Sequence, residues 1–177
     1  MPPQRRALVL GGTGMLAGCV ESLIDEGWHV VSPSRHRPTL YDTIWVQADW
    51  SQPGTLAERA QAALGGPADL LVAWVHSSFR VPVLRAVSPL LAANAPVVEV
   101  HGSSSANPVF GCPEPVLPDH PTQQVVLGFL RNGGGRTRWL THRETADGVL
   151  AAVTRALEGR PHEVHQVGEF RPYTALH

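Results

Sequence analysis

Apolar residues along the chain follow two alternating patterns. Short, nearly continuous apolar runs are typical of strands that are covered on both faces. Between them lie segments in which apolar positions recur at helical spacing, as in helices that pack on a sheet. The predicted strands are residues 6–10, 29–31, 43–48, 68–75, 96–101 and 163–168. Because these strands alternate with helices, the pattern predicts an α/β fold, namely a single-domain, Rossmann-like, doubly wound parallel sheet with helices on both faces that spans residues 1–177.

Local signals mark the ends of the first two predicted helices. The first helix starts at Met15 and ends before Gly27, a residue type that suits the position after a last helical turn. The second opens with Thr55 and Glu58, which have the spacing of a capping box, and it ends at residues 65–67.

Two later helices are predicted in the same way. One starts near Pro82, and Pro89 must kink or divide it. The last opens with a second capping box, Thr141 and Glu144, and ends before Gly159. Its predicted inward-facing residues are Ala146, Val149, Leu150, Val153 and Leu157.

Three segments between these elements are irregular or ambiguous. Ser32-Pro33 is predicted to stop the second strand, and the proline-rich residues 102–122 predict a loop. Residues 124–140 predict a β-hairpin with Asn132–Gly135 as its turn, although a short helix over residues 122–131 also fits the pattern.

The segment GGTGMLAG, residues 11–18, joins the first predicted strand to the first helix. It contains the pattern Gly-x-Gly-x-x-Ala, from Gly12 to Ala17, that is typical of dinucleotide-binding sites. The glycines allow a sharp turn and a close approach to a pyrophosphate, and the following helix offers free N–H groups. The residues predicted to hold the cofactor here are Gly11, Gly12, Thr13, Gly14, Met15 and Leu16.

The end of the second strand indicates which dinucleotide is bound. A site for NAD usually places Asp or Glu about 20 residues beyond the glycines, against the ribose 2′-hydroxyl. Here that position is Ser34, followed by Arg35 and Arg37, and no carboxylate is present. Guanidinium groups pair well with a phosphate, so the sequence favours NADP(H).

Composition narrows the class of protein. Of the 177 residues, 43% are hydrophobic and 16% are charged, with a formal net charge of -1, which gives no electrostatic reason to bind nucleic acid or a membrane surface. No apolar run approaches the ~20 residues of a membrane span, and the apolar run after residue 6 is too short for a signal peptide. We therefore expect a soluble, cytoplasmic protein with no metal site, and a homo-oligomer is compatible with this composition.

Several stretches resemble small, atypical bacterial members of the short-chain dehydrogenase/reductase superfamily. They are GGTGMLAG (11–18), SR (34–35), Ala48-Asp49, VVEVHGSSSANP (97–108) and RWLTHRETADGVLAAV (138–153). The resemblance implies that Asp49 contacts the adenine, with Trp50 beside it. It also implies that the end of the fourth strand, including Ala73 and Trp74, borders the nicotinamide ribose.

The chain departs from this superfamily at its catalytic pair. Reductases of the superfamily use a tyrosine as proton donor and a lysine four residues later. All 14 basic residues of this chain are arginine, and its two tyrosines, Tyr41 and Tyr173, lie outside the corresponding segment. The usual tyrosine-based reduction of a carbonyl is therefore excluded.

Other side chains at the ends of the central strands are candidates for proton transfer. In an open α/β sheet, ligands bind outside the carboxyl ends of the strands, and histidine is a common acid or base. The predicted catalytic residues are His76, His101, Ser103 and Ser104.

These observations predict an NADP(H)-dependent reductase of a small organic molecule, with C=N or conjugated C=C bonds favoured over simple ketones. Two alternatives stay open at this point. One is a non-catalytic sensor or regulator that binds NADP(H), and the other is a non-redox lyase or cyclase on the same fold.

Overall fold

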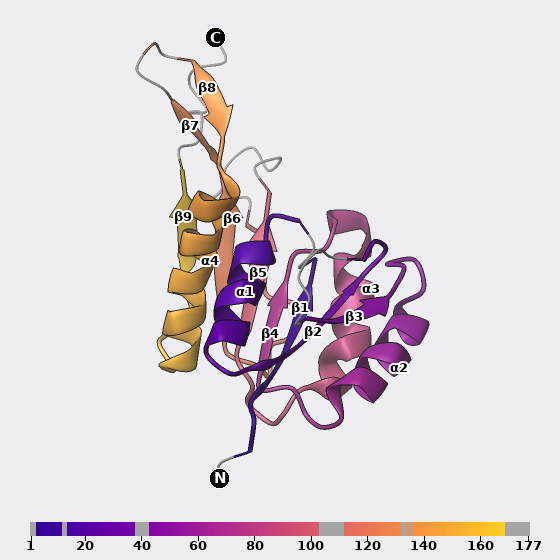
Figure 1. Cartoon of the computed structure of the whole chain (residues 1–177). Coiled ribbons are helices and arrows are strands. Elements are labelled where there is room, and N and C mark those ends of the chain that lie inside the picture. The colour runs from indigo at the N-terminus through magenta and orange to yellow at the C-terminus, as the bar shows by residue number, and fades with distance from the viewer. Residues whose placement is uncertain are drawn as a thin grey trace.

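A seven-stranded parallel sheet runs through the molecule, in the order β3-β2-β1-β4-β5-β6-β9 (Figure 1). The structure, a computed structural model, describes residues 3–11, 14–37, 43–102, 112–131, 134 and 136–168. Starting from β1, the sheet is wound outward in both directions, which is the strand order of a Rossmann-like fold. The predicted fold class is confirmed.

The strands of this sheet match the apolar runs closely. They are β1 (Arg6–Leu10), β2 (His29–Ser34), β3 (Ile44–Gln47), β4 (Leu70–Ala73), β5 (Val97–His101), β6 (Thr122–Leu127) and β9 (Val164–Val167). The prediction that Ser32-Pro33 stops the second strand is wrong. β1 pairs with β2 only as far as Val31, and Pro33 pairs with Val46 of β3. The missing N–H of Pro33 therefore interrupts no ladder on the β1 side.

Helices cover both faces of the sheet. α1 (Ala17–Asp25) and α4 (His142–Leu157) share one apolar cluster with Val98 and Val100 of β5. α2 (Pro53–Leu64) and α3 (Ser77–Val87) share the other cluster with Val97. Figure 1 shows the two pairs of helices on opposite sides of the sheet.

Two of the predicted helix starts are wrong. α2 begins with Pro53 in its first turn, and its N-cap residue, Gln52, makes no side-chain hydrogen bond. The proline, which suits a first helical position, sets the start of this helix instead of Thr55. α3 begins at Ser77, so Pro82 lies inside it. Pro89 does divide the segment, because a separate 3-10 turn, η1 (Ser88–Leu90), follows α3.

The last helix has the predicted capping box. The Thr141 side chain accepts a hydrogen bond from the Glu144 N–H, and the Glu144 side chain accepts one from the Thr141 N–H. The inward position of Leu157 is wrong, since this residue is 39% exposed. The buried stripe of α4 is instead continued at its end by Val153 and Ala156, because a straight helix rotates its inner face slowly along its length.

The hairpin predicted over residues 124–140 is confirmed for residues 129–139 only, because residues 124–127 belong to β6 of the parallel sheet. β7 (Phe129–Arg131) and β8 (Thr137–Trp139) pair antiparallel and form a sheet of their own. The alternative of a helix over residues 122–131 is wrong, because most of this range is strand β6. The hairpin projects from the end of the molecule at which the parallel strands terminate (Figure 1). Among the described residues, no helix is both long and apolar enough to cross a bilayer.

Candidate functional site

The turn between β1 and α1 has a shape that only glycine allows at one position. Gly11 has a φ of +87°, and a Cβ added there would lie 2.6 Å from the backbone oxygen of Trp74, at the end of β4. A Cβ on Gly14 would meet nothing within 4 Å, so open space lies beside this residue. Gly12 and Thr13 lie outside the described residues. The turn therefore has the close backbone approach and the open side that a dinucleotide needs.

The N-terminus of α1 points its free groups toward the same turn. Its N-cap residue, Leu16, makes no side-chain capping hydrogen bond. The Ala17 N–H donates to the Gly14 backbone oxygen at 3.0 Å, which leaves the next backbone N–H groups of the first turn for an anion. The Leu16 side chain is buried in the core, which leaves only its backbone to face a cofactor. A Cβ on Gly18 would lie 2.6 Å from the Cβ of Ala146, so Gly18 provides the close packing of α1 on α4.

The residues predicted to select the cofactor lie at the end of β2. Arg35 and Arg37 are exposed, and the Arg37 guanidinium lies 5.8 Å from the centre of the Trp45 ring. Ser34 is buried, donates a hydrogen bond to the His36 backbone oxygen at 2.7 Å, and accepts one from Trp45 Nε1 at 3.0 Å. Ser34 therefore shapes the turn that carries the two arginines.

The residues predicted for the adenine follow β3. Asp49 accepts hydrogen bonds from the backbone N–H and the hydroxyl of Ser51, at 2.9 and 2.8 Å. These bonds, together with the charge of Arg35, hold the pKa of the Asp49 carboxyl below its usual range. Trp50 is half-buried and packs against the α2–α3 cluster. Asp49 is thus an exposed carboxylate whose orientation is set by its neighbour.

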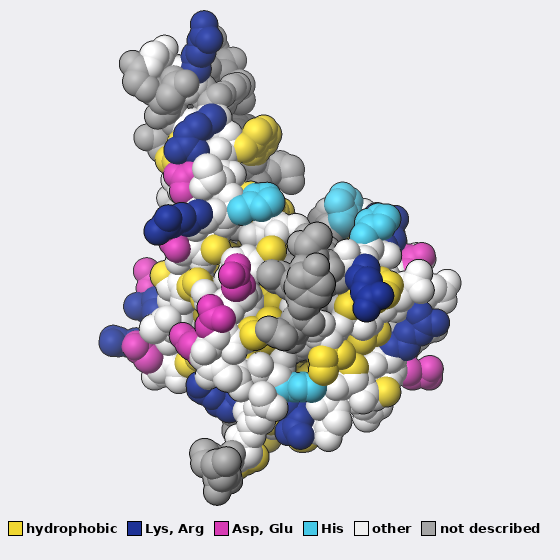
Figure 2. All heavy atoms as spheres, in the orientation of Figure 1, with side chains coloured by type: hydrophobic (Ala, Val, Ile, Leu, Met, Phe, Trp, Pro, Cys, Tyr) yellow, Lys and Arg dark blue, Asp and Glu magenta, His cyan; other side chains and the backbone are white. Residues whose placement is uncertain are grey.

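A cavity of about 390 Å³ opens where several strands end. It lies between the β1–α1 turn, the ends of β4, β5 and β6, and the start of α4. Figure 2 shows hydrophobic and histidine side chains exposed near the base of the hairpin. The residues that line the cavity are Met15, Trp74, Gly102, Leu127, Gly128, Trp139, Leu140 and His142.

The structure brings two of the predicted cofactor residues, Met15 and Trp74, into the lining of this cavity. Ala73 is buried at the end of β4, directly before Trp74. Trp139 and His142 were not among the predicted site residues, although both lie in the segment that resembles the superfamily. The available signal in the sequence was a tryptophan two residues before the capping box at Thr141.

Neither of the two histidines predicted to be catalytic lines this cavity. His76 is the N-cap residue of α3, and its Nδ1 accepts the Ser78 N–H at 3.3 Å. Side chains alternate along a strand, so His101 faces the α3 side together with Val97, whereas Gly102 lines the cavity on the other side. Ser103 and Ser104 lie outside the described residues.

His101 also has an unusual environment. Burial, and secondarily the charge of Arg80, lowers its pKa to about 4. Its Nε2 is buried without a hydrogen-bond partner among the described residues. The imidazole is therefore neutral at pH 7 and holds no extra proton to donate.

A buried ion pair lies below His101 on the same face of the sheet. The Arg80 and Glu99 side chains are 11% and 3% exposed and approach to 2.7 Å. Arg80 also donates to the Glu114 backbone oxygen at 2.9 Å, which ties the segment after residue 111 to the sheet. Burial raises the pKa of the Glu99 carboxyl, and the Arg80 guanidinium opposes this shift. Residues 112–121 contain no helix. Arg80 of α3 therefore connects this segment, through the Glu114 backbone oxygen, to Glu99 of β5.

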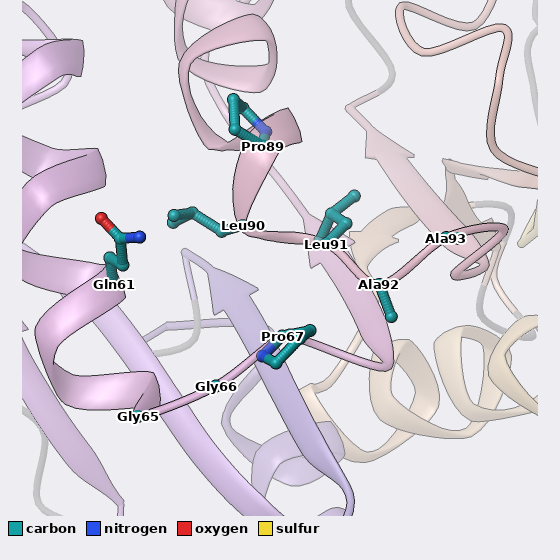
Figure 3. A pocket seen from close by; sticks show the side chains of 9 residues that line it. All are labelled: Gln61, Gly65, Gly66, Pro67, Pro89, Leu90, Leu91, Ala92 and Ala93. Atoms are coloured by element: carbon teal, nitrogen blue, oxygen red, sulfur yellow. The ribbon is translucent and has the colours of Figure 1, made fainter.

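A second cavity, of about 450 Å³, lies at the opposite ends of the strands (Figure 3). It is formed by residues 65–67 and 89–93 together with Gln61, the one polar side chain that Figure 3 shows in its lining. It is remote from the β1–α1 turn and lacks a group that transfers protons. In the part of the chain that the structure describes, no cluster of three or more metal-ligating side chains occurs.

Comparison with known proteins agrees with the fold. No protein-family model matches the chain, and no curated protein matches it. A carbonyl reductase from Pseudomonas aeruginosa PAO1, solved in complex with NADP, superposes with a TM-score of 0.64 at 17% identity, over 96% of this chain and 100% of that one. A short-chain dehydrogenase/reductase family oxidoreductase from Brucella ovis, solved with a partially ordered NAD, gives 0.68 at 11% identity, over 94% and 100%. An aldohexose dehydrogenase from Thermoplasma acidophilum gives 0.65 at 11% identity, over 93% of each chain. The fold of this chain is therefore that of the short-chain dehydrogenases/reductases, as the resemblance in sequence predicted.

Proposed function

We propose that the protein is an NADP(H)-dependent reductase of a small organic molecule. The observation that carries this proposal is the geometry of Gly11, whose backbone passes so close to Trp74 that a side chain is excluded. This close approach lies at the first strand-to-helix turn, next to an uncapped helix N-terminus and to an apolar cavity. The likeness in fold to solved oxidoreductases, one of them in complex with NADP, supports the same function.

The chain's own residues fit such a cofactor along the whole edge of the sheet. The α1 N-terminus would bind the pyrophosphate, Arg35 and Arg37 the 2′-phosphate, and Asp49 the adenine. Ala73 and Trp74 would border the nicotinamide ribose. The bound cofactor supplies a hydride, and the apolar side chains around Met15 and Trp74 exclude water from the place where it is delivered.

Calorimetric titration with NADPH and NADH tests the cofactor assignment. We expect NADPH to bind more tightly, and Arg35→Glu to weaken NADPH binding by about tenfold or more, since a hydrogen bond to a charged group contributes ~1.5–3 kcal/mol. NADH binding should change much less. Arg85→Glu, the same charge change at an exposed position on α3, should leave both affinities unchanged. Equal binding of NADPH and NADH would refute the assignment.

The substrates are expected to contain C=N or conjugated C=C bonds. The chain has no lysine and thus no partner for the tyrosine that reduces ordinary ketones in the superfamily. A screen of imines, enones and ketones with NADPH, followed at 340 nm, tests this expectation. Rapid turnover of simple ketones that depends on Tyr41 or Tyr173 would contradict it.

A non-catalytic sensor of NADP(H) is the second candidate. The positions of His76 and His101 favour it, because one caps a helix and the other lies on the far face of the sheet from the cavity. Tight NADPH binding without turnover of any screened compound, together with a partner interaction that differs between NADPH and NADP⁺, would support the sensor.

A further inference from the structure

We propose that the cavity of about 390 Å³ binds an uncharged, flat aromatic compound, with Trp139 as the specificity-determining wall and His142 as the hydrogen-bond donor to its polar end. The proposal rests on the proposed function in one respect, since it takes this compound to be the substrate of the reductase.

The residues that line the cavity explain why its ligand is expected to be uncharged. Five apolar side chains and two glycines surround the cavity, and the imidazole of His142 is the one ionisable group among the described lining residues. A carboxylate or ammonium group placed there would lose its water without gaining an ion-pair partner, which is costly. A neutral ligand loses little on entry. The volume lies within the ordinary range of small-molecule pockets.

The walls of the cavity explain why its ligand is expected to be flat. Two indole rings, Trp74 and Trp139, border the cavity, and aromatic rings pack well against other flat rings. A Cβ on Gly102 would meet nothing within 4 Å, so this wall is open backbone without a side chain. Trp139 is 76% exposed, although the next residue, Leu140, is only 7% exposed. The exposed ring at the rim is thus available to cover a ligand.

Hydrogen bonds link the backbone segment that carries Trp139 and His142. Arg138 donates to both carboxylate oxygens of Glu144, at 2.8 and 3.1 Å, and to the Trp139 backbone oxygen at 3.2 Å. Glu144 also accepts the Thr141 N–H at 2.9 Å. These bonds restrain the backbone from residue 138 to residue 144, which carries both side chains, and any such restraint lowers the cost of binding.

Calorimetry with two matched probes tests the proposal. Benzylideneacetone is a neutral, conjugated, aromatic enone, and cinnamate at pH 8 has nearly the same skeleton with a carboxylate in place of the acetyl group. We expect the enone to bind the NADP⁺-loaded protein, in which no hydride can be transferred, at least tenfold more tightly than cinnamate. Trp139→Ala should weaken enone binding about tenfold, and Trp139→Phe should restore most of the loss. Leu157→Ala, which removes another exposed large hydrophobic side chain at the far end of α4 from the cavity, should have no effect.

His142 is tested with a third probe that lacks the oxygen. His142→Leu should weaken binding of benzylideneacetone but not of 1-phenylbut-1-ene, because the hydrocarbon accepts no hydrogen bond. Equal loss for both probes would overturn the role of His142 as donor.

The remaining outcomes separate this proposal from the proposed function. Enone binding without any NADPH binding refutes the reductase and leaves the aromatic site standing. NADPH binding with no enone binding, with cinnamate bound equally well, or with unchanged affinity in Trp139→Ala overturns the aromatic site. Competition between NADPH and the enone also overturns it, because the cofactor would then fill the cavity itself.

Discussion

Replacing Arg80 by methionine would leave the buried carboxylate of Glu99 without its partner. The two side chains are 11% and 3% exposed and approach to 2.7 Å. The other hydrogen bond to Glu99 among the described residues comes from the Val116 N–H, at 3.4 Å, and is long. Methionine retains most of the length of arginine without its charge, so the change removes the ion pair together with the hydrogen bond from Arg80 to the Glu114 backbone oxygen.

The expected loss of unfolding free energy is about 3–5 kcal/mol at pH 8, which is typical of a buried pair that loses one member. Glu99 can reduce this loss by taking up a proton, because burial raises the pKa of its carboxyl and Arg80 no longer opposes the shift. Proton uptake is easier at low pH, so the loss should be smaller at pH 5. The difference is at most about 1.4 kcal/mol for each pH unit.

Urea unfolding followed by tryptophan fluorescence and far-ultraviolet circular dichroism measures these differences at pH 5 and 8. The double variant Arg80→Met/Glu99→Gln removes both charges and should recover at least half of the loss. Arg160→Met is the control, because the pair Arg160–Glu158 is 58% and 49% exposed and should contribute less than ~1 kcal/mol. If Arg80→Met at pH 8 is no less stable than this control, or if the double variant is no more stable than Arg80→Met, the reasoning is refuted.

Three further predictions concern the turn after β1, the start of α4 and the end of β5. Gly11→Ala should abolish NADPH binding and lower the unfolding free energy by about 2 kcal/mol or more, because Gly11 has a positive φ and an added Cβ would collide with the Trp74 backbone oxygen. Calorimetry and urea unfolding test this prediction, and the control Gly14→Ala should fold normally. The pKa of Glu144 is lowered to about 2 by its hydrogen bonds with Arg138 and Thr141. The stability that the Glu144 carboxylate contributes is therefore complete above its usual pKa and is lost as the pH falls toward 2. In thermal melts, the Tm of Glu144→Gln should fall less over this pH range than that of the unchanged protein. Because the pKa of His101 is about 4, the unfolded chain takes up a proton there before the folded protein does, so stability falls as the pH drops from about 6.5 to 4; His101→Leu should flatten this dependence, and an NMR titration that places the pKa near 6.5 would contradict it.

Elements set by short-range rules were predictable from the sequence. The turn GGTGMLAG and the capping box of Thr141 and Glu144 each require particular residue types at fixed spacing, and both occur where they were expected. The start of α2 was mispredicted because two start signals compete within three residues, and Pro53 at the first helical position prevailed over Thr55.

The candidate site was only partly predictable, because the fold determines which residues meet there. Trp139 and His142 lie more than 100 residues from the glycine turn and reach the cavity through the position of α4. The placement of His101 could have been found from the sequence. Glu99 and His101 are two residues apart in a strand and must face the same side, whereas Gly102 faces the other. The low pKa of His101 depends on burial and on Arg80, neither of which has a local signature.

The separate sheet formed by β7 and β8 gives this protein two levels of local stability. Its pairing is confined to six residues, and it joins the body through Gly128, whose N–H donates to the Val167 backbone oxygen at 2.7 Å. Backbone amides of β7 and β8 should therefore exchange with solvent through small local openings, whereas those of β1 and β4 should exchange only through global unfolding. Since Trp139 belongs to this less stable unit, an occupied cavity would first be detected as slower hydrogen exchange in the hairpin, before any change in the central sheet.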